Sequence, residues 1–227
     1  MLNFLHKYAK NYHHSQNGEE GILLECWRRL CGIDSAISAD IAPQDGTLPL
    51  WMAESGRAVE IGGNDGLYCS NIALFAEHGW DSLFVEADFT LYQKCVENWQ
   101  GRYHVRSQCS RVDGRNVHAF VGDDCDLLSI DTDGSDYDIF CGMLARPKIV
   151  IVEIDSSIEP PSERVNSDGG VGYWTMTVAA LERGYFVICH TGNLILCRQE
   201  YGHLFPECEP HPLLEWELYF NRGWLKQ

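Results

Sequence analysis

The chain has 227 residues, of which 45% are apolar and 22% charged, and its formal net charge at pH 7 is −16. This length and apolar fraction suit a globular domain with a sizeable core. Nucleic acids and anionic membranes are bound through clustered Lys and Arg, so the net charge argues against both partners and favours a small-molecule or neutral acceptor.

The start of the chain and its cysteines predict the compartment. Residues 1–9 are too few and too polar for the apolar region of a signal peptide, and no apolar run reaches the length of a membrane-spanning helix. The ten cysteines include no C-x-x-C pair, and most lie in apolar patterns where Cys acts as a small hydrophobic residue. We expect a reduced, cytoplasmic protein without structural zinc.

The first expected element is a helix over 19–30. Apolar residues recur there at helical spacing, with glutamates at its start and arginines near its end. Gly32 ends the helix, and 33–50 reads as a loop because it combines Pro and Gly with polar residues. We therefore divide the chain into an N-terminal helical extension, residues 1–50, and one globular unit, residues 51–227.

From residue 57 onward, short β-rich runs alternate with helical patterns, which implies a mostly parallel, doubly wound sheet. A tight Thr191–Gly192 turn then separates two strands of an antiparallel hairpin. The fold class is α/β, a Rossmann-like sheet of seven strands with an antiparallel C-terminal hairpin. The predicted strands are 58–61, 82–86, 103–107, 126–131, 148–154, 185–190 and 193–197, and the predicted helices are 70–78, 89–99, 135–144 and 173–183.

The segment Val59 to Gly66 (V-E-I-G-G-N-D-G) carries the strongest functional signal. It reads as a strand, a glycine-rich turn and the approach to a helix, and about 20 residues later the next strand ends in Glu86. The spacing is E-x-G-x-x-x-G, whereas dinucleotide sites use G-x-G-x-x-G to place a pyrophosphate at a helix N-terminus. S-adenosylmethionine has no phosphate. Glycines let the backbone approach it, while Glu60 can serve its ammonium group and Glu86 its ribose hydroxyls. The alternative is an ordinary strand–turn–helix corner.

Carboxylates follow several predicted strands. The carboxyl ends of these strands form the ligand-binding edge of an open α/β sheet, so their repulsion there must be offset by cations or hydrogen-bond donors. The sulfonium supplies one charge, and Mg²⁺ is a further candidate, for which Asp131, Glu153 and Asp155 are the nominated oxygen ligands. The alternative is a site without metal, in which Asp133 and Asp136 only cap the following helix.

A hydroxyl acceptor must lose its proton as the new bond to the methyl group forms. His190 is the leading candidate for this base, because an ordinary histidine titrates near neutrality and His190 ends a strand on the functional edge. Asp133 is the second candidate. The competing interpretation of His190 is a core or surface histidine without a catalytic role.

Several segments together resemble the FkbM-like group of class I, S-adenosylmethionine-dependent methyltransferases. The order and spacing of the segments carry the resemblance, which spans most of 15–200. It implies a Rossmann-like fold, a bound methyl donor and a hydroxyl acceptor, often on a sugar or natural product. The chain departs from the family at Glu20, where Asp is common, and in its weak third strand. The segments are 15–22 (S-Q-N-G-E-E-G-I), 59–71, 79–80, 83–87, 115–117, 127–137 and 149–154.

The resemblance also suggests that the segment around Gln16 folds over the cofactor as a lid. The alternative is that Glu19 and Glu20 only favour the helix dipole. The predicted function is methyl transfer from S-adenosylmethionine to a hydroxyl of a sugar, glycan or natural product. The alternatives are a non-catalytic cofactor-binding module and a metal-assisted enzyme of related fold. The predicted cofactor-binding residues are Gln16, Glu60, Gly62, Gly63, Asn64, Gly66, Ser70, Glu86, Ala87 and Asp131.

Overall fold

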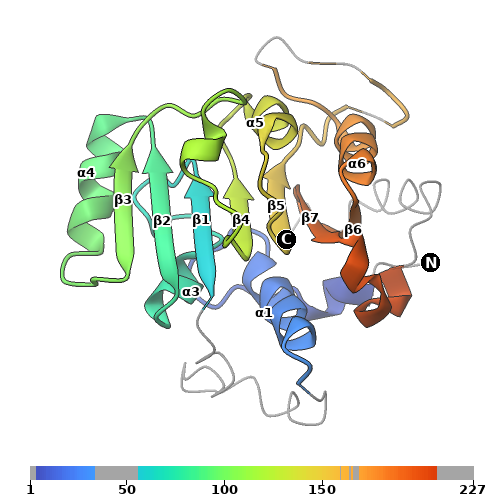
Figure 1. The fold of residues 1–227 in the computed structure, drawn as a ribbon, viewed down its shortest axis with the longest axis horizontal. Helices are drawn as coiled ribbons and strands as arrows, with labels where there is room; N and C mark the ends of the chain where they lie inside the picture. The colour runs from blue at the N-terminus through green and yellow to red at the C-terminus, as the bar shows by residue number, and fades with distance from the viewer. Residues whose placement is uncertain (1–3, 34–55, 159, 164, 166–168, 209–227) are drawn as a thin grey trace.

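The computed structural model of the chain describes residues 4–33, 56–158, 160–163, 165 and 169–208. These residues contain one seven-stranded sheet in the order β3-β2-β1-β4-β5-β7-β6 (Figure 1). Strands β1 to β5 are parallel, and β7 is antiparallel to both β5 and β6. The predicted fold class, including the hairpin, is confirmed. The strands are β1 (Arg57–Ile61), β2 (Asp81–Glu86), β3 (Val105–Cys109), β4 (Leu127–Ile130), β5 (Ile149–Glu153), β6 (Tyr185–His190) and β7 (Asn193–Arg198).

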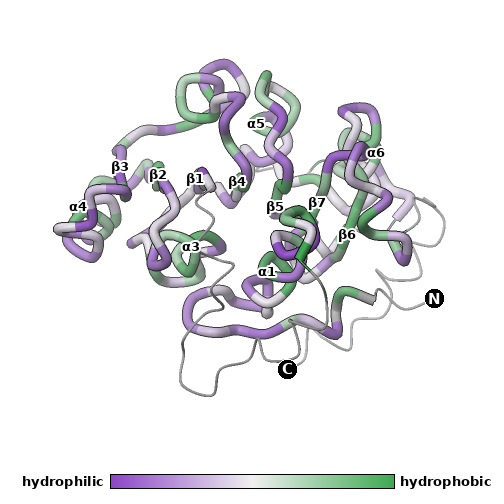
Figure 2. Tube along the Cα trace, turned by 60° about the horizontal axis from the view of Figure 1, so that its bottom comes forward, coloured by the Kyte–Doolittle hydropathy of each residue, from purple (hydrophilic) through white to green (hydrophobic). Residues whose placement is uncertain are grey.

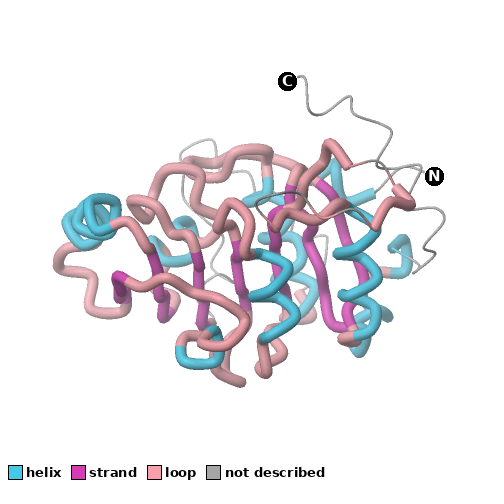
Figure 3. Tube along the Cα trace, turned by 90° about the horizontal axis from the view of Figure 1, so that it is seen from above, coloured by secondary structure: helices cyan, strands magenta, loops and turns pink. Residues whose placement is uncertain are grey.

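Helices cover both faces of the sheet, which lies between them when viewed from above (Figure 3). The α-helices within the described residues are α1 (Glu19–Leu30), α3 (Ala73–Glu77), α4 (Phe89–Asn98), α5 (Asp136–Gly142) and α6 (Tyr173–Glu182). The same residues include the short 3-10 helices η1 (Phe4–Tyr8), η3 (Val117–Ala119), η4 (Gln199–Leu204) and η5 (Pro206–Cys208).

All strands except β3 are buried on both faces, and their alternate residues belong to two hydrophobic clusters. On β1, Val59 packs in the cluster that includes residues of α5 and α6, while its neighbour Ala58 packs in the cluster that includes residues of α1, α3 and α4. This follows from the two-residue period of a strand. Hydrophobic residues concentrate along β5, β7 and β6, the most apolar part of the sheet (Figure 2).

Helix α1 belongs to the same core as the sheet. Ile22, Cys26 and Trp27 are buried in the cluster that contains residues of β5, β6 and β7, and the Trp27 ring lies 4.5 Å from that of Trp80. The N-terminal helix is therefore packed on the globular unit. The predicted boundary at residues 50 and 51 and most of the predicted 33–50 loop lie outside the described residues.

Two elements depart most from their predicted bounds. The helix predicted over 70–78 is shorter, because Ser70 and Asn71 form the capped turn that precedes α3. The third strand begins at Val105, two residues later than predicted, and its side chains are exposed or half-buried, which explains its weak hydrophobic pattern. None of the helices in the described part of the chain is long and apolar enough to cross a membrane.

Candidate functional site

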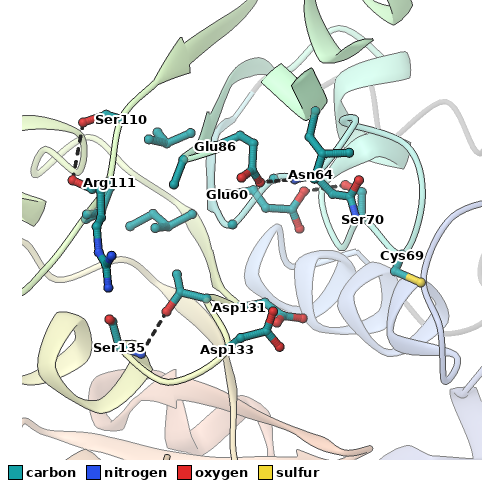
Figure 4. Close-up of a pocket in the computed structure, with 18 of the residues that line it drawn as sticks. Glu60, Asn64, Cys69, Ser70, Glu86, Ser110, Arg111, Asp131, Asp133 and Ser135 are labelled. Atoms are coloured by element: carbon teal, nitrogen blue, oxygen red, sulfur yellow. Dashed lines mark hydrogen bonds between the residues drawn. The ribbon is translucent and has the colours of Figure 1, made fainter. Parts of the chain in front are cut away.

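A cavity of about 400 Å³ opens at the carboxyl ends of β1, β2 and β4. Ligands bind at this edge in open α/β sheets. Eight of the ten predicted cofactor-binding residues line it, together with Asp133, one of the two predicted bases. Figure 4 shows Glu60, Glu86 and Asn64 on one side and Asp131 and Asp133 on the other. The eight are Glu60, Gly62, Gly63, Asn64, Ser70, Glu86, Ala87 and Asp131.

Glu60 ties the end of β1 to the start of α3. Only 3% of its surface is exposed, and its two oxygens accept hydrogen bonds from the Ser70 hydroxyl, at 2.5 Å, and from the backbone N–H of Asn71, at 2.9 Å. Burial raises the pKa of Glu60 to about 7, and these hydrogen bonds oppose the increase. Glu60 thus holds the wall of the cavity, and its carboxylate keeps lone pairs for a ligand.

Glu86 plays the same part at the end of β2. Its Oε2 accepts a hydrogen bond from the backbone N–H of Asn64 and its Oε1 one from that of Asp88, at 2.8 and 2.7 Å. The half-buried carboxylate is thereby oriented at the cavity wall. Each oxygen retains a second lone pair, so the group can still accept two hydrogen bonds from neighbouring hydroxyls of a ribose.

Gly62 is required by the protein itself. Its φ is +83°, and a Cβ atom at this position would lie 1.6 Å from the backbone oxygen of Asp131. The turn after β1 therefore passes directly against the end of β4, and only glycine allows that approach. Both Gly62 and Gly63 donate their N–H groups to the Val85 oxygen, which fixes the turn against β2 as well.

The cavity concentrates unusual backbone conformations. Among the described residues, the only non-glycine residues with positive φ are Asn64, Cys69 and Asp133, at +49°, +57° and +55°. All three line the cavity. Left-handed backbone costs free energy for residues with a Cβ atom, and such conformations tend to occur at functional sites. The turns that surround the cavity are therefore held in shape by the rest of the fold.

An acidic group lies at the edge of the cavity nearest β5. Asp131, Asp133 and Glu153 each offer one oxygen within 4.8 Å of the others. Burial raises the pKa of both Asp131 and Glu153, neighbouring carboxylates raise it further, and the two groups hydrogen-bond to each other. Of the predicted metal ligands, the structure brings Asp131 and Glu153 together with Asp133. Asp155 lies outside the group, because its Oδ1 accepts from the backbone and hydroxyl of Ser157.

His190 lies behind the site. It is 2% exposed, and its Nε2 lies 3.2 Å from the Ser156 hydroxyl oxygen. Ser156 lines a second, smaller cavity beside Asp133, whereas His190 is not among the residues that line it. A role for His190 as a base therefore has to operate through Ser156, while Asp133 lines both cavities directly.

Two predicted cofactor-binding residues lie away from the cavity lining. Gln16 is exposed, and its backbone oxygen accepts from the Asn11 side chain. Gly66 has a φ of +77°, and a Cβ atom there would lie 2.6 Å from Cys95 Sγ and from Trp99 Nε1. Gly66 is thus a packing glycine against α4. Beside Gln16, Glu20 accepts hydrogen bonds from three successive backbone N–H groups, those of residues 12–14, and so shapes the N-terminal segment.

Sequence reasoning missed the wall that follows β3. Ser110, Arg111 and Val112 line the cavity directly after this strand ends. Arg111 is the only Lys or Arg among the described lining residues, and its side chain points toward Ser135 (Figure 4). The strand-end rule that identified the carboxylates would have identified this segment, but the weak pattern of β3 obscured where the strand ends.

Comparison with solved structures places this geometry in a known fold. Monomeric WbdD is 12% identical, with a TM-score of 0.50, over 87% of this chain and 48% of its own. The mitomycin 7-O-methyltransferase MmcR is 17% identical, with a TM-score of 0.43, over 65% of this chain and 50% of its own. The chain has a Rossmann-like fold. It spans about half the length of these two proteins. A putative RNA methyltransferase from Pyrococcus horikoshii is 12% identical, with a TM-score of 0.47, over 87% of this chain and 96% of its own. No protein-family model and no curated protein matches the sequence.

Proposed function

We propose that the chain is an S-adenosylmethionine-dependent methyltransferase whose donor binds in the 400 Å³ cavity. The supporting observation is that side chains of the protein accept hydrogen bonds from the backbone N–H groups at the start of α3, beside that cavity. The backbone N–H of Asn71 donates to Glu60, and those of Ile72 and Ala73 donate to Ser70 Oγ. In dinucleotide sites, N–H groups at a helix start bind the ligand phosphate. Here these N–H groups are already engaged by the protein and are not available to a phosphate.

The charges around the cavity support the same donor. Glu60, Glu86, Asp131 and Asp133 line it, and the described lining residues include a single Arg. This charge disfavours a pyrophosphate and favours a ligand with an ammonium and a sulfonium group. Glu60 accounts for the ammonium and Glu86 for the ribose hydroxyls. The resemblance to the FkbM-like group and the methyltransferases among the structures of similar fold point in the same direction.

When bound, the donor supplies a methyl group activated by its sulfonium. The chain itself would have to align the acceptor hydroxyl with the donor and supply a base for the proton that this hydroxyl loses. Asp133 is the leading candidate for this base, because it lines both the donor cavity and the smaller cavity beside it. Ser156 and His190 offer a second route for the proton.

The acceptor that we propose is a hydroxyl of a sugar, glycan or natural-product small molecule, within the cytoplasm. The net charge of −16 supports this choice over nucleic acid or an anionic membrane. Incubation with S-adenosylmethionine labelled in its methyl group and a panel of such hydroxyl compounds tests the proposal. We expect label in one class of acceptor together with S-adenosylhomocysteine. Cofactor binding without transfer to any compound would instead indicate a binding module.

A divalent cation is a separate proposal. Asp131, Asp133 and Glu153 supply the oxygen ligands that Mg²⁺ prefers, and a cation there would orient an acceptor hydroxyl and offset the local negative charge. Transfer measured before and after EDTA treatment tests it. If EDTA abolishes methyl transfer and added Mg²⁺ restores it, the proposed metal site is supported. Full activity in EDTA would exclude a required metal ion.

A further inference from the structure

A second cavity adjoins the donor site. Its volume is about 250 Å³, and Asp133 lines both cavities. Its walls are the turn between β4 and α5, the end of β5 and the chain at Gly170 and Val171. Its position at the carboxyl edge of the sheet, in contact with the donor site, is where a second substrate has to lie for methyl transfer.

The lining of this second cavity is one-sided in charge. Among the described residues that form it, four carry carboxylates and none is Lys, Arg or His. Asp136 is already engaged, because it accepts from the Thr132 and Gly134 N–H groups, and one oxygen of Asp155 accepts from Ser157. Glu153 is half-buried and shares a hydrogen bond with Asp131, whereas Asp133 is exposed, so Asp133 is the carboxylate most available to a ligand.

The charge restricts the ligand class. An acceptor that carries a carboxylate or phosphate would be repelled by this lining, whereas the hydroxyls of a neutral polyol would find hydrogen-bond acceptors. A protonated amine would bind this lining more tightly than a neutral hydroxyl does, because a hydrogen bond between charged partners is roughly twice as strong as a neutral one. Tyr137 and Ile154 also line the cavity and provide apolar contact for a ring.

We propose that the second cavity is the acceptor subsite and that it takes a hydroxyl-bearing amine, such as an amino sugar. This rests on the proposed methyltransferase function. The amine binds among the carboxylates of this lining, and the reacting hydroxyl faces the donor past Asp133. The cavity defines the site, and its carboxylates select the ligand.

Three sugars with the same ring and different charge test the proposal. They are 2-amino-2-deoxyglucose, glucose and glucuronic acid, titrated separately by ligand-observed NMR into protein saturated with S-adenosylhomocysteine at about pH 7. We expect the amino sugar to bind about tenfold more tightly than glucose, and glucuronic acid to bind most weakly. Equal binding of all three, preference for glucuronic acid, or no binding of any of them overturns the proposal.

Single substitutions show which carboxylates cause the preference for the amino sugar. Glu153→Gln should reduce the preference for the amino sugar severalfold, and so should Asp133→Asn, which suits a left-handed backbone position. Asp123→Asn removes the same charge from an exposed residue four positions before β4 and should leave the preference unchanged. Equal loss in all three variants would contradict a local site. Mg²⁺ that binds the cavity and abolishes amine binding would identify a metal site and overturn the proposal.

The same samples test donor binding and acceptor class separately. S-adenosylhomocysteine binding is recorded before any sugar is added. Its absence refutes the proposed function, while its presence without charge-selective sugar binding refutes only the acceptor class.

Discussion

The Ser70 hydroxyl donates a hydrogen bond of 2.5 Å to Glu60 Oε2, and this contact joins the end of β1 to the start of α3. Ser70 Oγ also accepts from the N–H groups of Ile72 and Ala73. One serine thus caps the helix and holds the buried carboxylate that lines the donor cavity. The site is preformed by contacts within the protein.

Substitution Ser70→Ala should destabilise the fold. It removes a helix cap and leaves a buried carboxylate with one partner fewer, which together cost about 1–3 kcal/mol in free energy of unfolding. Urea unfolding measures the change. Ser135→Ala is the matched control, because Ser135 precedes α5 without a side-chain capping bond, and it should stay within about 0.5 kcal/mol. Similar costs for both variants would mean that the Ser70 contacts contribute little.

The buried Glu60 should make stability depend on pH. Burial raises its pKa from 4.5 to about 7, so the folded state binds a proton that the unfolded chain has released over this interval. The contribution of Glu60 to stability therefore falls as pH rises through this window and levels off above it. Unfolding free energies at several pH values should show a shallower decline in Glu60→Gln than in the wild type. Parallel profiles would show that Glu60 titrates normally.

Alanine substitutions at two glycines distinguish the cost of backbone strain from the cost of steric overlap. Gly62 and Gly79 both have positive φ, but a Cβ atom would meet the Asp131 oxygen at 1.6 Å in the first case and nothing within 4 Å in the second. Gly79→Ala should cost about 1–2 kcal/mol from backbone strain. Gly62→Ala should cost clearly more, since β4 has to move. Unfolding measurements that give equal costs would refute the close approach between the two turns.

Local patterns predicted much of this fold. Helix α1 and the hairpin were predicted because apolar periodicity and turn residues agree with the tertiary structure. Glu60 and Glu86 were found because each lies within the last two residues of a buried strand at the ligand edge. The spacing of Gly66 in the motif carries no sign that the residue packs against Trp99, because that contact depends on how α4 folds back.

The remaining differences concern residues whose places depend on loops. Asp133 joins the acidic group through a left-handed turn, and Asp155 instead forms its own turn with Ser157. His190 ends a strand as predicted, but it is buried and lines neither cavity. Strand ends identify an edge of the sheet, whereas loop geometry decides which side chains reach the cavity.

Glu86→Gln should weaken binding of S-adenosylhomocysteine about tenfold. The substitution replaces an oriented carboxylate with an amide that has one acceptor oxygen, and a hydrogen bond to a charged group is worth about 1.5–3 kcal/mol. Calorimetric titration of the variant measures this loss, and thermal unfolding confirms that the variant is folded. Asp123→Asn serves as the charge-matched control. An unchanged affinity of Glu86→Gln for S-adenosylhomocysteine would show that Glu86 does not bind the ribose.

We expect the 400 Å³ cavity to hold an S-adenosyl ligand and to exclude a dinucleotide. Calorimetric titration of the wild-type protein with S-adenosylhomocysteine and, separately, with NAD tests it most directly. We predict one molecule of S-adenosylhomocysteine bound per chain, in the micromolar range or tighter, and no heat from NAD. Binding of NAD without S-adenosylhomocysteine, or no binding of either ligand, would contradict the account.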